Sequence, residues 1–144
     1  MRKIALFVLP LLVLVGCASL SYYSPPEKEF SPKAKEIKKA IKQKFDDIPV
    51  PEKMVLDAKS SFVFDNGEIR LAHLRYFTRL APEDVTAYFK KELPLQGWSM
   101  VNVVEYGERM LSFSKEEESL VITIYPEKRG CRIVISLTPK ASGL

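Results

Sequence analysis

The sequence predicts an α+β domain in which a mainly antiparallel sheet carries a helix on one face. Two observations predict this fold. Residues 62–138 contain six short strand-like segments, and the last three of these alternate apolar and polar side chains, as antiparallel strands do when one face is buried. After the second segment, residues 82–93 repeat apolar side chains at helical spacing. The expected order is therefore β-β-α-β-β-β-β, preceded by a basic amphipathic helix.

The N-terminal segment has the composition of an export signal. Met1-Arg2-Lys3 is basic, and the residues from Ile4 to Val15 are almost wholly apolar. A spanning helix needs roughly 20 apolar residues, so this run is too short to cross a membrane and has the proportions of a signal peptide.

The run ends in Leu14-Val15-Gly16-Cys17, which resembles the lipobox of a bacterial lipoprotein precursor. By that resemblance, residues 1–16 are removed and Cys17 carries three acyl chains of the palmitate type. This would anchor the protein permanently to a membrane of the cell envelope, outside the cytoplasm. Ala18, rather than Asp, implies the outer membrane, facing the periplasm, if the host is Gram-negative. An ordinary signal peptide and a permanent signal anchor are the alternatives.

Residues 17–30 are expected to be a lipidated tether, because serine and proline disfavour regular structure there. Extended at roughly 3.1 Å per residue, such a linker holds a domain some 40 Å from the membrane. Residues 31–53 are expected to form a basic helix and a Pro-rich connector. Ser31 suits the N-cap and Pro32 the first helical position. After this helix, Asp46 and Asp47 are expected to form a solvated turn rather than a metal or acid–base pair.

The basic helix carries an apolar stripe at Ile37, Ile41 and Phe45 and is otherwise crowded with lysines. Four of them are candidates for contact with an anionic lipid surface or with a partner: Lys35, Lys38, Lys39 and Lys42. The alternative, which the narrow stripe favours, is a helix packed on the domain with its lysines in water.

Residues 54–144 are expected to form the globular domain. Its first hairpin is predicted to turn at Asn66-Gly67, a pair that suits a two-residue type I′ turn. This turn predicts two core-facing pairs, Phe64 with Ile69 and Phe62 with Leu71. Leu74 and Tyr76 have the opposite parity, so either a bulge resets the strand or both of its faces are covered.

A helix is then expected from Pro82 to Leu93, stopped by Pro94 and Gly97. Trp98 is predicted to pack over the end of that helix. The remaining strands are expected at 98–106, 110–115, 120–125 and 131–138.

No catalytic motif is evident, and no cofactor or metal site is expected. His73 is the only histidine, and zinc would need several His and Cys ligands. Cys131 alternates with apolar residues and is expected in the core, and lipidated Cys17 leaves it no disulfide partner. Removal of Arg2 and Lys3 lowers the formal charge from +4 to +2, which argues against a nucleic-acid partner.

These patterns are compatible with two functions. The preferred one is a membrane-anchored, non-enzymatic interaction or structural accessory module with an envelope protein partner. It predicts a filled core, no polar pocket and an exposed apolar or charged patch. The alternative is a small-ligand-binding or enzymatic domain with a cavity between helix and sheet. It predicts a pocket of several hundred Å³, with His73 and Tyr76 as the candidate polar lining.

Overall fold

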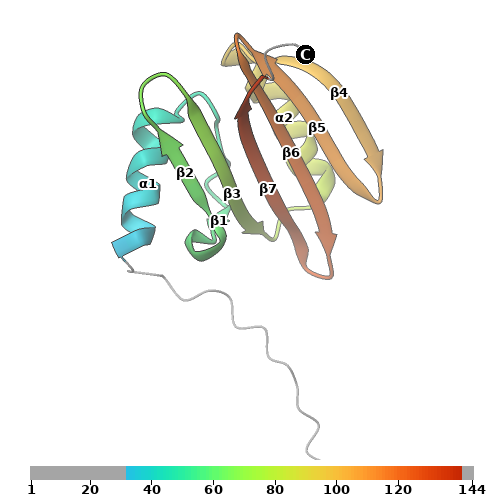
Figure 1. The fold of residues 1–144 in the computed structure, drawn as a ribbon. Coiled ribbons are helices and arrows are strands. Elements are labelled where there is room, and N and C mark those ends of the chain that lie inside the picture. Colours follow the sequence, from blue (N-terminus) through green and yellow to red (C-terminus); the bar gives the residue numbers. More distant parts are fainter. Residues whose placement is uncertain (1–31, 141–144) are drawn as a thin grey trace, which may run out of the picture.

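The computed structural model describes residues 32–140, which form one seven-stranded antiparallel sheet and two α-helices (Figure 1). The elements along the chain are α1 (Pro32–Lys44), β1 (Val55–Leu56), a 3₁₀ turn η1 (Ala58–Ser60), β2 (Phe62–Asp65), β3 (Arg70–Thr78), α2 (Pro82–Leu95), β4 (Ser99–Tyr106), β5 (Glu108–Lys115), β6 (Glu118–Glu127) and β7 (Gly130–Pro139). The predicted signal peptide, Cys17 and the predicted tether lie outside the described residues. No helix within 32–140 is long and apolar enough to cross a membrane.

The predicted α+β class and antiparallel sheet are confirmed. The strands lie in the order β1-β3-β7-β6-β5-β4, and β2 pairs with β3 alongside β1. The expected order of elements is confirmed in part, because the two-residue strand β1 precedes the six predicted strands and α2.

Both helices contribute to one buried cluster on one face of the sheet. From α2, Val85, Phe89 and Leu93 are fully buried, and from α1, Ala34 and Ile37 join the same cluster. Figure 1 shows α2 behind β5 and β6, and α1 beside β2 at the edge of the sheet. Among the described residues no helix covers the opposite face, which we call the open face.

The register predicted for the first hairpin is wrong. Phe64 pairs with Leu71 and Phe62 with His73, so four residues connect the strands instead of two. The side chains of Asp65 and Asn66 cause the difference, because they accept hydrogen bonds from the backbone of the turn. Asp65 Oδ1 accepts from Gly67 N–H at 2.7 Å, and Asn66 Oδ1 from Ile69 N–H at 2.8 Å.

The core-facing side assigned to this hairpin is also wrong. Phe62 and Phe64 lie on the open face and are 56% and 43% exposed. β3 pairs with β7 without interruption from Ala72 to Thr78, so no bulge resets it. Leu74 and Tyr76 face the helices, and their parity places the aromatic residues of β2 on the other side.

Pro94 does not stop α2, which continues to Leu95. Proline has no N–H, but the last turn closes without one, since Gln96 N–H donates to Leu93 O at 2.9 Å. Gly97 (φ 86°) then ends the helix. Trp98 follows and is buried, as predicted, with its indole N–H donating to Asp47 O at 2.9 Å.

Candidate functional site

A groove of about 310 Å³ lies between α1 and the edge of the sheet formed by β1 and β3. Its apolar lining comes from α1, from β1 with the residue before it, and from β3: Ile41, Met54, Val55, Leu56 and Tyr76. Within residues 32–140, its charged lining consists of Lys38 and Lys42. We call it the Tyr76 groove.

Strand β1 places the lining next to Tyr76. Leu56 lies directly opposite Tyr76 in the β1–β3 pair. Beyond Leu56 the edge of β3 stays hydrogen-bonded, because Asp57 N–H donates to Arg75 O at 2.8 Å and Arg75 N–H donates to Ser61 Oγ at 3.0 Å. Although η1 separates β1 from β2, these hydrogen bonds hold the chain against β3. β1 is therefore a short wall of the groove with a fixed position.

The hydroxyl of Tyr76 has no hydrogen-bond partner among residues 32–140. The side chain is only 5% exposed, and burial raises its pKa to about 12. The hydroxyl is not fully enclosed either, and Tyr76 is one of the residues that line the groove. Buried hydroxyls in native proteins are normally hydrogen-bonded, so this one is available to a ligand.

Lys38 and Lys42 lie one turn apart on the solvent side of α1 and are exposed. Ala34 and Ile37 turn towards the sheet and fix the orientation of the helix. None of the ion pairs within the described residues involves either lysine. Since no carboxylate of the described chain lines the Tyr76 groove, its two ammonium groups favour an anion.

A charge cluster holds the C-terminal end of α1 in place. Arg70 donates to Lys44 O at 2.8 Å and to Asp47 Oδ1 at 3.0 Å, and Lys115 donates to Asp47 Oδ2 at 2.8 Å. Trp98 Nε1 donates to Asp47 O at 2.9 Å. A turn is present as expected and Asp46 is exposed in it, but the prediction that Asp47 is solvated is wrong. Burial would raise the pKa of this carboxyl, but the hydrogen bonds from Arg70 and Lys115 outweigh burial and lower it.

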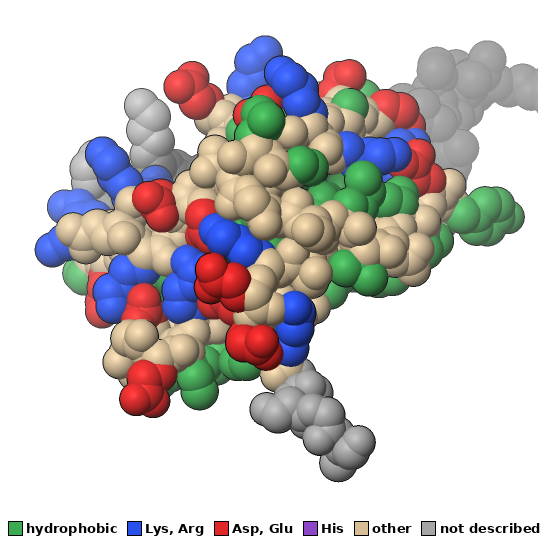
Figure 2. All heavy atoms as spheres, turned by 90° about the horizontal axis from the view of Figure 1, so that it is seen from above, with side chains coloured by type: hydrophobic (Ala, Val, Ile, Leu, Met, Phe, Trp, Pro, Cys, Tyr) green, Lys and Arg blue, Asp and Glu red, His purple; other side chains and the backbone are tan. Residues whose placement is uncertain are grey.

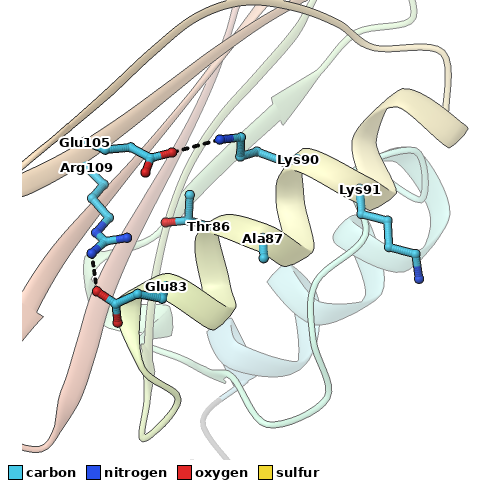
Figure 3. Close-up of a pocket in the computed structure, with 7 residues that line it drawn as sticks. All are labelled: Glu83, Thr86, Ala87, Lys90, Lys91, Glu105 and Arg109. Atoms are coloured by element: carbon cyan, nitrogen blue, oxygen red, sulfur yellow. Dashed lines mark hydrogen bonds and ion pairs between the residues drawn. The ribbon is translucent and has the colours of Figure 1, made fainter.

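A second hollow, of about 500 Å³, lies between α2 and the β4–β5 hairpin (Figure 3). It is lined by Glu83, Thr86, Ala87, Lys90, Lys91, Glu105 and Arg109. Figure 3 shows two ion pairs across it: Lys90 Nζ lies 2.8 Å from Glu105 Oε1, and Arg109 pairs with Glu83. Lys91 points away and pairs with Glu92. Because its charges neutralise one another, this hollow offers a ligand less than the Tyr76 groove does.

Of the two residues predicted to line a pocket, the structure places only Tyr76 in one. His73 lies on the open face, where its Nδ1 is 3.4 Å from Ser136 Oγ. The two residues are three positions apart on β3, so they point to opposite faces of the sheet. Cys131 is buried on the helix side of the sheet, as predicted. It therefore lies on the opposite face from His73.

The four candidate lysines all lie exposed on α1. Lys38 and Lys42 line the Tyr76 groove, whereas Lys35 and Lys39 line neither hollow. Met54 and Leu56 were not predicted as lining residues from the sequence. Their signal was weak, because a two-residue strand has no periodicity to read.

Comparison with known proteins identifies the family. Neither the curated proteins nor the solved structures contain a match to this chain. The sequence pattern of the family described as START domain-like matches residues 59–138, more than half of the 144-residue chain. The matched segment contains α2, strands β2 to β6, η1 except Ala58, and β7 except Pro139. The chain therefore belongs to the START domain-like family.

Proposed function

We propose that this protein is a non-enzymatic binding module of the bacterial cell envelope, anchored through lipidated Cys17, and that the Tyr76 groove holds one anionic amphiphile. One observation carries the proposal: an unpartnered tyrosine hydroxyl and two unpaired lysines meet at an apolar groove. Membership of the START domain-like family is compatible with ligand binding.

Each part of the groove suits one part of such a ligand. Ile41, Met54 and Leu56 offer apolar surface to a hydrocarbon chain. Lys38 and Lys42 can pair with a carboxylate or a phosphate at the mouth. The Tyr76 hydroxyl can donate to an ester, hydroxyl or phosphate oxygen near the head group. A volume of about 310 Å³ suits a short acyl chain, or the part of a longer chain next to its head group.

The two functions considered from sequence make different demands on the structure. The accessory module predicts a filled core, and the side chains by which α2 meets the sheet, Val85, Phe89 and Leu93, are fully buried. The ligand-binding domain predicts converging polar groups at a pocket, and the Tyr76 groove supplies them beside the first helix rather than the second. A protein partner is the second candidate. It is favoured by exposed apolar residues along β4, where Val101 is 65% and Tyr106 91% exposed.

Native mass spectrometry of the full-length, lipidated protein tests the proposal. Dodecanoate or dodecyl phosphate is added to the detergent-solubilised protein before it is freed from detergent in the spectrometer. Uncharged dodecanol is the control ligand. We expect one equivalent of either anion to bind more tightly than dodecanol. Lys38 and Lys42 would each form a partly exposed ion pair with the bound anion. Removing both pairs should weaken anion binding about tenfold.

The variant for this test is Lys38→Gln with Lys42→Gln. Its matched control is Lys90→Gln with Lys91→Gln, which removes two lysines from the other hollow. The control should bind both anions as the wild type does. Equal binding of dodecanol and dodecyl phosphate, or equal loss in both variants, would refute the proposal.

A further inference from the structure

The β1–β2 edge exposes large apolar side chains on its open-face side. Val55, Phe62 and Phe64 are 50%, 56% and 43% exposed. In the strand registers they lie beside Phe77, His73 and Leu71 of β3. All three therefore lie on the same face of the sheet, and the position of Arg75 on β3 separates the Val55 pair from the Phe62 pair. We call Val55, Phe62 and Phe64 the edge patch.

The other side of this edge is basic. Helix α1 packs against β2 and η1 and carries six lysines in thirteen residues. Lys38, Lys39 and Lys42 are exposed and belong to no ion pair among the described residues. Figure 2 shows Lys and Arg side chains gathered at the left, the side on which Figure 1 places α1.

Val55 joins the two surfaces. It belongs to the edge patch and also lines the Tyr76 groove with Lys38 and Lys42. Apolar side chains and unpaired ammonium groups therefore share one margin of the domain, and the mouth of the groove opens between them.

We propose that this β1–β2 edge docks on the anionic surface of the bilayer that carries the lipid anchor. The inference rests on the anchor in the proposed function and deepens it, because it turns the mouth of the Tyr76 groove towards the membrane. Exposed Phe together with Lys is the combination that interfacial segments use on anionic lipid. Lys is depleted at protein interfaces, so the composition favours lipid over a protein partner.

The position of α1 in the chain supports this orientation. Pro32 begins α1, and the segment back to Cys17 reaches roughly 40 Å when extended at about 3.1 Å per residue. That reach does not by itself force contact. It does keep the domain at a high effective concentration near the surface, so that a weak patch suffices for docking. Each lysine close to an anionic membrane strengthens association by about fivefold.

Lysine footprinting of the lipidated, full-length protein in vesicles tests the docking. Vesicles of phosphatidylcholine alone are compared with vesicles that also contain phosphatidylglycerol. Anionic lipid should slow acetylation of Lys38, Lys39 and Lys42 about fivefold or more. Lys91, on α2 with a side chain 77% exposed, is the internal control and should react equally in both vesicles.

A matched pair of variants tests the apolar part. Phe62→Ser with Phe64→Ser should remove most of the protection. Val104→Ser with Met110→Ser should leave it intact, because these exposed residues pair with each other on the open face at the far edge. All four side chains are at least partly exposed, and an unchanged thermal midpoint verifies that each variant is folded.

Equal labelling of the α1 lysines in both kinds of vesicle would overturn the inference, as would protection of Lys91. Protection in native envelopes but not in lipid vesicles would indicate a protein partner and would overturn it too. The two proposals fail separately. Dodecyl phosphate binding without the footprint refutes only docking, and the footprint without dodecyl phosphate binding refutes only the ligand.

Discussion

Replacing Tyr76 with Phe should stabilise the ligand-free protein. A buried hydroxyl without a partner costs about 1–3 kcal/mol. The Tyr76 hydroxyl is not fully enclosed and keeps part of its hydration, so its removal should raise the free energy of unfolding at pH 7 by about 0.5–1 kcal/mol. The aromatic ring, and with it the packing of the core, is unchanged. The same substitution should weaken binding of dodecyl phosphate.

Alkaline pH should widen this difference. Burial raises the pKa of Tyr76 from 10.0 to about 12, so the folded state favours the neutral hydroxyl. The resulting stability is complete below pH 10 and is lost as the pH rises from 10 through 12. At pH 11 the wild type should have lost about 1 kcal/mol that Tyr76→Phe retains. Cys131 also has a raised pKa, but it is present in both proteins and cancels in the comparison.

Urea unfolding of the lipidated protein in detergent at pH 7 and pH 11 measures both effects. Tyr106→Phe is the control, because Tyr106 is 91% exposed and its substitution should change nothing. A Tyr76→Phe protein that is less stable than the wild type at pH 7 would mean that the hydroxyl is hydrogen-bonded. The groove would then have no free hydroxyl to offer a ligand, and the proposed site would lose its main support.

Three further predictions concern the framework of the site. Asp47→Asn should lower the free energy of unfolding by about 1–2 kcal/mol in urea titrations at pH 7, since it weakens the bonds from Arg70 and Lys115. The pKa of Asp47 is lowered, so its contribution is present above pH 3.8 and disappears as the pH falls below that value; the two proteins should converge in acid. Gly130→Ala places a Cβ against the carbonyl of Thr78 and should lower the free energy of unfolding by about 3 kcal/mol. At Gly67 a Cβ would meet no atom, so Gly67→Ala should lower it by only about 1 kcal/mol, and thermal unfolding of both variants measures the difference. Burial raises the pKa of the Cys131 thiol to about 11, so a disulfide reagent at pH 8 should label it only after unfolding; rapid labelling of the native protein would contradict its burial.

The strands that were predicted best are those with one clear apolar face. From β5 to β7, Leu111, Ile122 and Ile135 belong to uninterrupted alternations, and each side chain is fully buried as expected. Alternation fixes the face of a strand whenever only one parity is apolar. That condition nearly holds for these strands, where few residues of the other parity, such as Val121 and Val134, are apolar, so their faces could be predicted without knowledge of their neighbours.

β3 breaks that condition, because apolar residues occur at both parities. Leu71 and Phe77 have one parity and Leu74 and Tyr76 the other, so the sequence alone does not say which set meets the helices. The pairing with β7 decides it, since Leu74 lies beside buried Ile135. This long-range contact reverses the face expected for the first hairpin. It also separates His73 from Tyr76, although both were predicted to line the same pocket.

The Tyr76 groove depends on a further long-range relation that local patterns do not encode. Residues 59–138 carry the family pattern and supply Tyr76, whereas Lys38, Ile41 and Leu56 come from the segment before it. The charge cluster at Asp47 fixes α1 over the edge of the sheet and so brings the two parts together. If the ligand is an anion, its specificity resides in α1, outside the family pattern. Removing charge from α1 should then change which ligand binds, while the family segment keeps its fold, because the lysines are exposed and the apolar stripe of α1 supplies the packing.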